Sequence, residues 1–177
     1  VGSLSSAILI SKLLSMPDPR KHKQAGEFIK KVGHNRALAI MGCDALKGFI
    51  AVFIGRILGL DNDALACMII TSVLGHVFSA FFGSTGGKGF STLLGGIFGI
   101  SLTCGLLTLA TWLIVLLLYR YLSLAAIIAS ACSFIFFYLL SDPYYVFPVL
   151  FAAGIVIFAH REHISLIMHN EEPKLEF

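Results

Sequence analysis

A series of apolar runs, joined by short polar connections, is the feature that most constrains this chain. Several of the runs approach the ~20 residues that a helix needs to cross a bilayer. Hydrophobic residues make up 57% of the 177 residues, and charged residues only 13%. A soluble domain carries about a quarter charged residues, so soluble classes are excluded. The sequence predicts an all-α, polytopic integral membrane protein.

About seven transmembrane helices are expected, the first of them truncated at its N-terminus. A break is expected near residue 100, because Ser101 and Thr103 interrupt a run too long for one upright helix. No polar linker divides the chain, so a single domain over residues 1–177 is predicted. The expected spans are residues 1–16, 37–60, 64–82, 90–99 (a short helix), 102–119, 121–140 and 144–159.

The distribution of lysine and arginine predicts the orientation of the chain. Alternate connections hold most of these residues, whereas the opposite turns hold Asp61, Asp63 and Asp142 with neither Lys nor Arg. Basic connections of membrane proteins collect on the cytoplasmic side. The following segments are therefore expected to face the cytoplasm: 17–36, 83–89, Arg120 and 160–177.

A glycine-rich turn with one lysine lies between two apolar runs. It reads Gly86-Gly87-Lys88-Gly89, and Thr92 follows in the first turn of the next run. Glycines let the backbone approach an anion closely, and a helix start adds free N–H groups and a positive dipole end. The pattern predicts a phosphate cradle, although a flexible turn with a solvated lysine remains an alternative. It is not a P-loop, because Gly89 stands where Ser or Thr would follow the lysine.

Ionisable residues also lie within or at the ends of the predicted spans. Asp44 and Lys47 are three residues apart, on one helix face, and can pair. Charges inside a span are costly and usually face a polar cavity, so this pair is expected to support a site. A purely structural ion pair is the alternative. His76 and His160 are candidate catalytic residues, or alternatively a satisfied helix-end histidine and a membrane-boundary anchor.

Three segments stand out together: Asp44-x-x-Lys47-Gly48, Gly75-His76 with Gly86-Gly87-Lys88-Gly89 and Thr92, and His160-Arg161-Glu162. In order and spacing they resemble the bacterial acyl-phosphate:glycerol-3-phosphate acyltransferase (PlsY) family. The resemblance implies a multi-pass enzyme of the bacterial inner membrane with a cytoplasm-facing site. It would transfer an acyl group from acyl phosphate to the 1-hydroxyl of glycerol 3-phosphate, giving lysophosphatidic acid and phosphate. The implied partners are these two substrates and membrane lipids; no cofactor, metal or nucleic acid is implied.

Roles follow for the residues that match. The turn Gly86–Gly89 would bind a substrate phosphate, with Lys30 and Arg20 as further cations. His76 and His160 would orient the glycerol hydroxyl or carry its proton. Further site-supporting residues are Asp44, Lys47, Thr92 and Arg161.

Two other functions remain open. The loop after Arg20 lacks the family's Gly-Ser-Gly-Asn motif, and His163 stands where the family has asparagine. A member that has lost catalysis and only binds lipid or a partner is one alternative. A small-anion transporter, with Asp44, Lys47, Arg56 and His76 along its path, is the other. Against transport, the cations collect at one face and no inverted repeat is visible.

Overall fold

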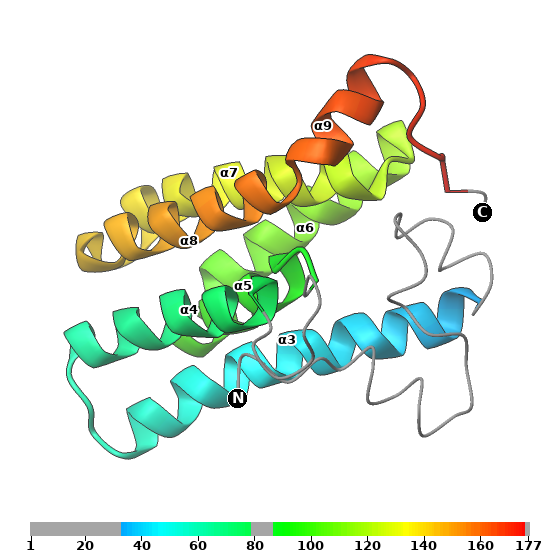
Figure 1. The fold of residues 1–177 in the computed structure, drawn as a ribbon. Coiled ribbons are helices and arrows are strands. Elements are labelled where there is room, and N and C mark those ends of the chain that lie inside the picture. The colour runs from blue at the N-terminus through cyan, green and yellow to red at the C-terminus, as the bar shows by residue number, and fades with distance from the viewer. Residues whose placement is uncertain (1–32, 79–86, 176–177) are drawn as a thin grey trace.

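The computed structural model describes residues 33–78 and 87–175, and their regular structure is entirely helical (Figure 1). The all-α prediction is confirmed. Each span predicted from residue 37 onward corresponds to one helix, whereas the predicted first span lies outside the described residues. The helices are α3 (His34–Ile57), α4 (Asn62–Val77), α5 (Phe90–Ile100), α6 (Leu102–Tyr119), α7 (Leu122–Leu140), the 3-10 turn η2 (Pro143–Tyr145), α8 (Val146–Ala159) and α9 (Arg161–Met168).

The helices differ in whether they could cross a membrane alone. By length and composition, α3, α6 and α7 could do so, and α8 with α9 would form a fourth, broken span. The remaining two, α4 and α5, are shorter apolar helices. With 11 residues, α5 is only ~16 Å long, about half the thickness of a bilayer core.

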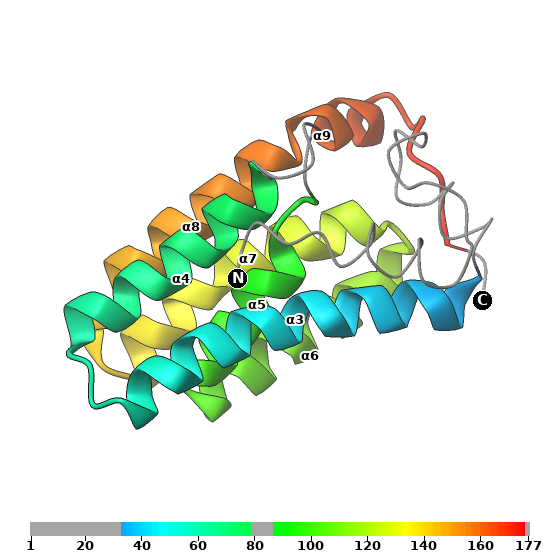
Figure 2. The same ribbon diagram turned by 60° about the horizontal axis from the view of Figure 1, so that its bottom comes forward.

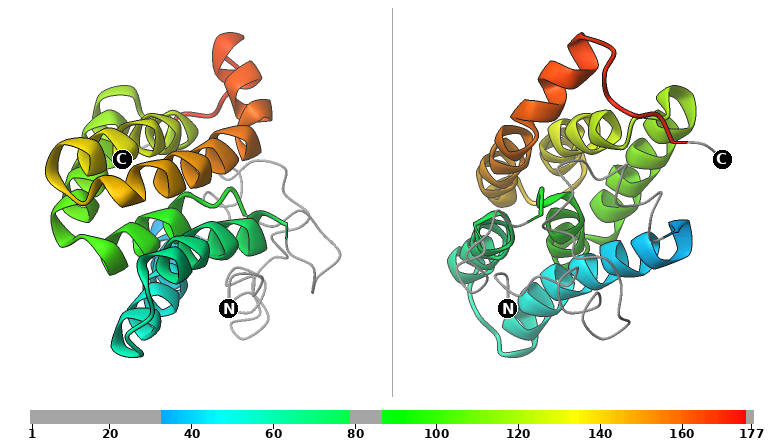
Figure 3. Two further views of the ribbon diagram at one scale, coloured as in Figure 1. Left: turned by 90° about the vertical axis from the view of Figure 1, so that its left-hand side faces the viewer. Right: turned by 45° about the vertical axis from the view of Figure 1, so that its right-hand side comes forward.

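Helix α5 lies at the centre of the bundle. It contacts α3, α4, α6, α7 and α8, and the right-hand view of Figure 3 shows it enclosed by them. Figure 2 shows α3, α4 and α8 side by side in front of it. A helix that is apolar all round is typical of a core position. Its buried residues are Phe90, Thr92, Leu93, Leu94, Gly95, Gly96, Ile97 and Gly99.

Two glycines bring α3 and α5 into close contact. A Cβ atom at Gly48 would overlap the carbonyl oxygen of Thr92, and one at Gly95 would overlap the carbonyl oxygen of Ala45. Small residues let helix backbones approach each other in membrane proteins. The contact places the middle of α3, with Asp44 and Lys47, against the start of α5.

The break between α5 and α6 lies at Ser101, as the sequence predicted. The Ser101 hydroxyl accepts a hydrogen bond from the Cys104 N–H at 3.3 Å and so caps α6. Arg56 near the end of α3 donates to the carbonyls of Gly99 at 3.0 Å and Ile100 at 3.1 Å. These carbonyls lie at the negative end of α5, which a cation stabilises.

The α7–α8 connection is hydrogen-bonded to the start of α4, at the end of the bundle that also carries the end of α3 and the α5–α6 break. The Tyr145 hydroxyl donates to Oδ1 of Asn62 at 2.7 Å, and the Tyr144 hydroxyl donates to Asp63. Asp142 holds this connection in shape by accepting from the Tyr144 N–H at 3.0 Å. Four polar side chains therefore join α4 to the segment that begins α8.

The last helix differs from the sequence prediction. The expected span of residues 144–159 ends where α8 ends, but the bend of 57° that follows at His160, and the separate helix α9 after it, were not expected. Figure 1 shows α9 leaving the line of α8 at this bend. The tail after α9 then returns to the bundle, where the Leu175 N–H donates to the Arg120 carbonyl at 2.9 Å.

Candidate active site

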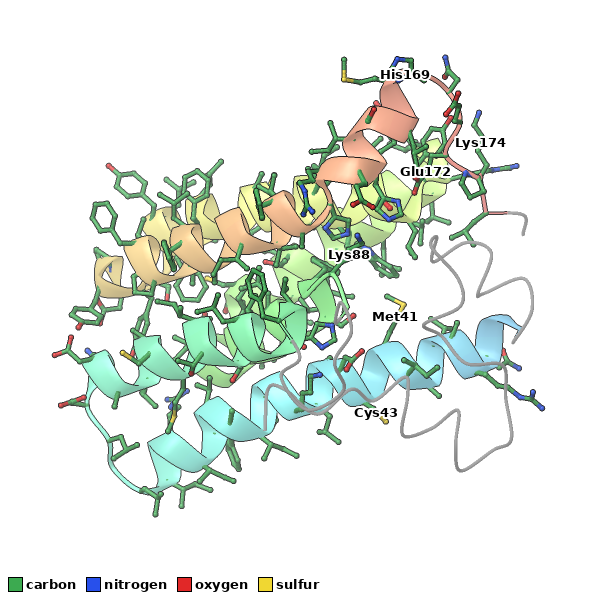
Figure 4. All side chains as sticks on the ribbon, in the orientation of Figure 1. Met41, Cys43, Lys88, His169, Glu172 and Lys174 are labelled. Atoms are coloured by element: carbon green, nitrogen blue, oxygen red, sulfur yellow. The ribbon has the colours of Figure 1, made fainter. Side chains whose placement is uncertain are left out.

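A cluster of three buried polar side chains, Asp44, Lys47 and His76, joins α3 to the end of α4. Nζ of Lys47 lies 2.8 Å from Oδ1 of Asp44, so the ion pair expected from their spacing is formed. The same Nζ lies 2.6 Å from Nδ1 of His76, and Oδ1 of Asp44 lies 3.6 Å from that nitrogen. All three residues are at most 8% exposed. Figure 4 shows that Met41, one turn earlier, points from α3 into the bundle, whereas Cys43 points away.

The glycine-lysine turn packs between α4 and α8. Gly89 has φ +87°, a left-handed conformation that favours glycine, and it caps α5. A Cβ there would lie 3.0 Å from Val77 of α4 and 3.3 Å from Val156 of α8. At Gly87, a Cβ would overlap the ring of His76. The turn therefore sets the free N–H groups at the start of α5 beside His76.

Lys88 is half-buried in this turn, below the junction of α8 and α9 (Figure 4). Burial lowers the pKa of its ammonium from the ordinary value of 10.5, while Glu162 acts to raise it and Arg161 to lower it. A phosphate beside Lys88 would restore a counter-charge to this cation. The start of α5 and Lys88 thus form an electropositive position at one end of the bundle.

His160 reaches the same end from α8. It is 4% exposed, and its Nδ1 lies 2.8 Å from the Val156 carbonyl oxygen. Because a carbonyl only accepts, Nδ1 must carry the proton, which leaves Nε2 as the acceptor of a neutral imidazole. His160 therefore has the tautomer that a proton acceptor needs.

A second buried cluster, missed by the sequence analysis, lies behind His160. Oε2 of Glu172 is 2.8 Å from Nδ1 of His163, and the Ser123 hydroxyl donates to Oε1 of Glu172 at 2.7 Å. Although burial alone raises the pKa of Glu172, hydrogen bonds from His163 and Ser123 outweigh it, so the pKa is lowered. The ring centroids of His160 and His163 are 6.0 Å apart. The returning tail thus supports the helix end that carries His160.

The other predicted site residues are placed as follows. Thr92 is buried in the first turn of α5, and its hydroxyl has no hydrogen-bond partner among the described residues. Arg161 is exposed, with its guanidinium 4.8 Å from the centroid of the Phe158 ring. Gly86, Lys30 and Arg20 lie outside the described residues.

The family of the chain follows from its match to known proteins. The family model described as glycerol-3-phosphate acyltransferase matches residues 1–170. The chain belongs to this family.

Members of the glycerol-3-phosphate acyltransferase family match over almost the whole chain. A protein of that name from Vibrio campbellii is 39% identical over 179 residues, which cover 99% of this chain and 88% of the relative. One from Coxiella burnetii is 36% identical over 180 residues, covering 99% and 93%.

Two solved structures of a glycerol-3-phosphate acyltransferase share the fold. They are crystal structures of the integral membrane enzyme PlsY (YgiH) in its glycerol 3-phosphate and lysophosphatidic acid forms. Their TM-scores are 0.89 and 0.87, at 31% identity, and each match covers 99% of this chain and 90% of the solved chain. Together with the apolar helices, these matches identify the chain as an integral membrane protein.

Proposed function

We propose that the chain transfers an acyl group from acyl phosphate to the 1-hydroxyl of glycerol 3-phosphate, giving lysophosphatidic acid and phosphate. The observation that carries the proposal is the convergence of Lys88, the start of α5 and His160 at one end of the bundle. Family membership supports it, since a solved relative is named as a glycerol 3-phosphate acyltransferase.

Acyl phosphate is a mixed anhydride with a good leaving group, so the reaction needs no covalent enzyme intermediate. The glycerol hydroxyl attacks the acyl carbonyl, an ester C–O bond forms, and the bond to the phosphate oxygen breaks. The protein must hold two anions close together with the hydroxyl facing the carbonyl. Positioning and charge stabilisation are therefore its main contributions.

Phosphate binding is assigned to the turn at the start of α5. Lys88 supplies a mobile charge, and the N–H groups of the first turn of α5 supply directed donors. Arg161 lies near enough to Lys88 to act on its pKa and can meet a second anionic group. Lys30 and Arg20 are proposed to add cations from the first loop.

The two histidines receive different roles. Nε2 of His160 is the unprotonated nitrogen, so it takes the proton of the 1-hydroxyl as the ester bond forms. Lys47, paired with Asp44, donates to Nδ1 of His76, which places the His76 proton on Nε2. His76 then donates from beside Gly87 to a substrate oxygen, and Asp44 and Lys47 hold it there.

The site is proposed to face the cytoplasm from the bacterial inner membrane. The excess of Lys and Arg in alternate connections of the sequence supports that orientation. Single cysteines introduced as Gln24→Cys, Thr85→Cys and Lys174→Cys in a Cys-less background are expected to resist an impermeant thiol reagent added to intact cells. Ready labelling of any of them from outside would reverse the orientation.

Three measurements on the same protein separate this function from its two alternatives. Purified protein is incubated with palmitoyl phosphate and glycerol 3-phosphate, and phosphate and lysophosphatidic acid are measured. We expect both products in equal amounts, and little of either from His160→Gln. A folded protein that binds glycerol 3-phosphate without turnover would support a binding role. Uptake of labelled glycerol 3-phosphate into vesicles, without product, would support transport.

A further inference from the structure

Two buried histidines lie next to each other where α8 passes into α9. His160 caps the end of α8, and His163 lies in the first turn of α9, beyond the bend. Their ring centroids are 6.0 Å apart, and the ring planes are inclined by 58°. The proposed reaction uses His160 and His76, so His163 is a buried titratable group that still has no role in it.

Glu172 from the returning tail sets the protonation of the His163 ring. Its Oε2 lies 2.8 Å and its Oε1 3.1 Å from Nδ1 of His163, and Oε1 also accepts from the Ser123 hydroxyl at 2.7 Å. These hydrogen bonds lower the pKa of Glu172, so the group is a carboxylate at neutral pH. Because a carboxylate only accepts, Nδ1 of His163 carries a proton, and Nε2 of the neutral ring is an acceptor.

His160 has the same tautomer through a different partner, the Val156 carbonyl oxygen, 2.8 Å from its Nδ1. The two neighbouring rings therefore each have an unprotonated Nε2. Within residues 33–78 and 87–175, neither of these two nitrogens has a hydrogen-bond partner. A pair of acceptors of this kind is suited to a ligand that carries two hydroxyl groups side by side.

Glycerol 3-phosphate carries two such hydroxyl groups. They are on neighbouring carbons, and the 2-hydroxyl lies between the phosphate and the reacting 1-hydroxyl. Phosphate binding is assigned to Lys88, and Glu172 lies near enough to Lys88 to act to raise its pKa. The cation and the two histidines thus belong to one end of the bundle, where a molecule of this size can meet all three.

We propose that His163 accepts a hydrogen bond from the 2-hydroxyl of glycerol 3-phosphate, with Glu172 as its positioning residue, and that this contact selects for a phosphorylated vicinal diol. The inference rests on the proposed function, because that reaction assigns the 1-hydroxyl to His160. His163 takes no proton in the reaction; it holds the glycerol so that the 1-hydroxyl faces His160. A substrate without the 2-hydroxyl leaves a buried acceptor unpaired, which costs binding free energy.

The test compares two acyl acceptors. 3-Hydroxypropyl phosphate keeps the phosphate and the reacting hydroxyl of glycerol 3-phosphate but lacks the 2-hydroxyl. At fixed palmitoyl phosphate, kcat/KM for each acceptor is measured in wild type, His163→Phe, His163→Asn, Glu172→Gln and the exposed control Glu171→Gln. We expect wild type and Glu171→Gln to favour glycerol 3-phosphate by about tenfold or more, and His163→Phe to bring the ratio near unity.

The ratio separates a specific contact from a structural role. A loss of folded protein lowers kcat/KM for both acceptors equally and leaves their ratio unchanged. His163→Asn keeps an acceptor oxygen and should retain part of the selectivity, whereas Glu172→Gln releases the ring and should lower it. A wild-type ratio near unity, or an unchanged ratio in His163→Phe, overturns the proposal. If His163→Phe does not fold, an unchanged ratio in Glu172→Gln overturns it instead.

Binding gives a readout that does not depend on acyl transfer. Isothermal titration with each of the two phosphates, in the absence of acyl phosphate, should show the same preference in wild type and its loss in His163→Phe. If no acyl transfer is found but this pattern holds, the proposed function fails and the role of His163 stands. Equal affinities of wild type for the two phosphates overturn that role even where acyl transfer is observed.

Discussion

Nζ of Lys47 lies 2.6 Å from Nδ1 of His76, which joins α3 to the end of α4 through two buried side chains. The same ammonium is held by Asp44 at 2.8 Å, one turn earlier on α3. Burying an ion pair inside a membrane costs desolvation free energy. Because the Asp44–Lys47 pair also contacts His76 beside the glycine turn, we infer that it supports the site as well as the packing of α3 against α4. The pair fixes the ring of His76 and therefore the direction of its Nε2.

Removing the Asp44 charge tests this relationship. Asp44→Asn is expected to destabilise the protein by roughly 3 kcal/mol, because Lys47 is left buried without its carboxylate. The double variant Asp44→Asn, Lys47→Met should recover part of the loss in Tm, measured by thermal unfolding in detergent. If the double variant is no more stable than the single one, the pair does not act as a unit.

Lys88 should contribute to binding rather than to folding. Lys88→Ala is expected to weaken glycerol 3-phosphate binding by ~1.5–3 kcal/mol, the value of a charge-assisted hydrogen bond, with little change in Tm. Isothermal titration would measure the affinity. Lys174→Ala removes an exposed cation from the tail and serves as the matched control. Unchanged affinity in folded Lys88→Ala would leave the turn as an ordinary loop.

The lowered pKa of Lys88 gives the binding a defined pH dependence. Because burial lowers this pKa below 10.5, the ammonium is lost at a lower pH than in an ordinary lysine. Affinity for glycerol 3-phosphate should therefore decline as the pH rises through that lowered value. In Lys88→Arg the decline should disappear, since a guanidinium stays protonated throughout this range. A decline of the same size in both proteins would assign it to another group.

Glu172 should stabilise the protein above mildly acidic pH. Its pKa is lowered by His163 and Ser123 despite burial, so the stabilisation is present above the unfolded value of about 4.3 and is lost as the pH falls through the folded value. Glu172→Gln is expected to cost about 2 kcal/mol at neutral pH, and this difference should vanish in acid. The neighbouring exposed Glu171, changed to Gln, is the control in thermal unfolding. Equal effects of the two substitutions would contradict the role of the cluster.

Local features of the sequence predicted most of the helices. The break at Ser101 follows from its capping hydroxyl, and the Asp44–Lys47 pair follows from a spacing of three. Both signals lie within a few residues of the positions they determine. The α8–α9 bend was not predicted, because polar residues after His160 are equally compatible with a fraying helix end.

Contacts between distant segments could not be predicted from local patterns. Nothing in the run around Lys47 indicates that it meets His76, 29 residues later. The return of Glu172 to Ser123, 49 residues earlier, depends on how α7 and α9 pack. The sequence therefore named no site residue in the polar tail, although Glu172 supports the helix end that carries His160.

The ties among Asn62, Asp63, Tyr144 and Tyr145 fasten α4 to the α7–α8 connection at the end away from the site. Because these ties hold α4 and α8 together at one end, a tilt of one helix against the other displaces their opposite ends most. Any tilt of α4 against α8 is therefore expected to be smallest at these ties and largest at the opposite helix ends, which carry His76 and His160.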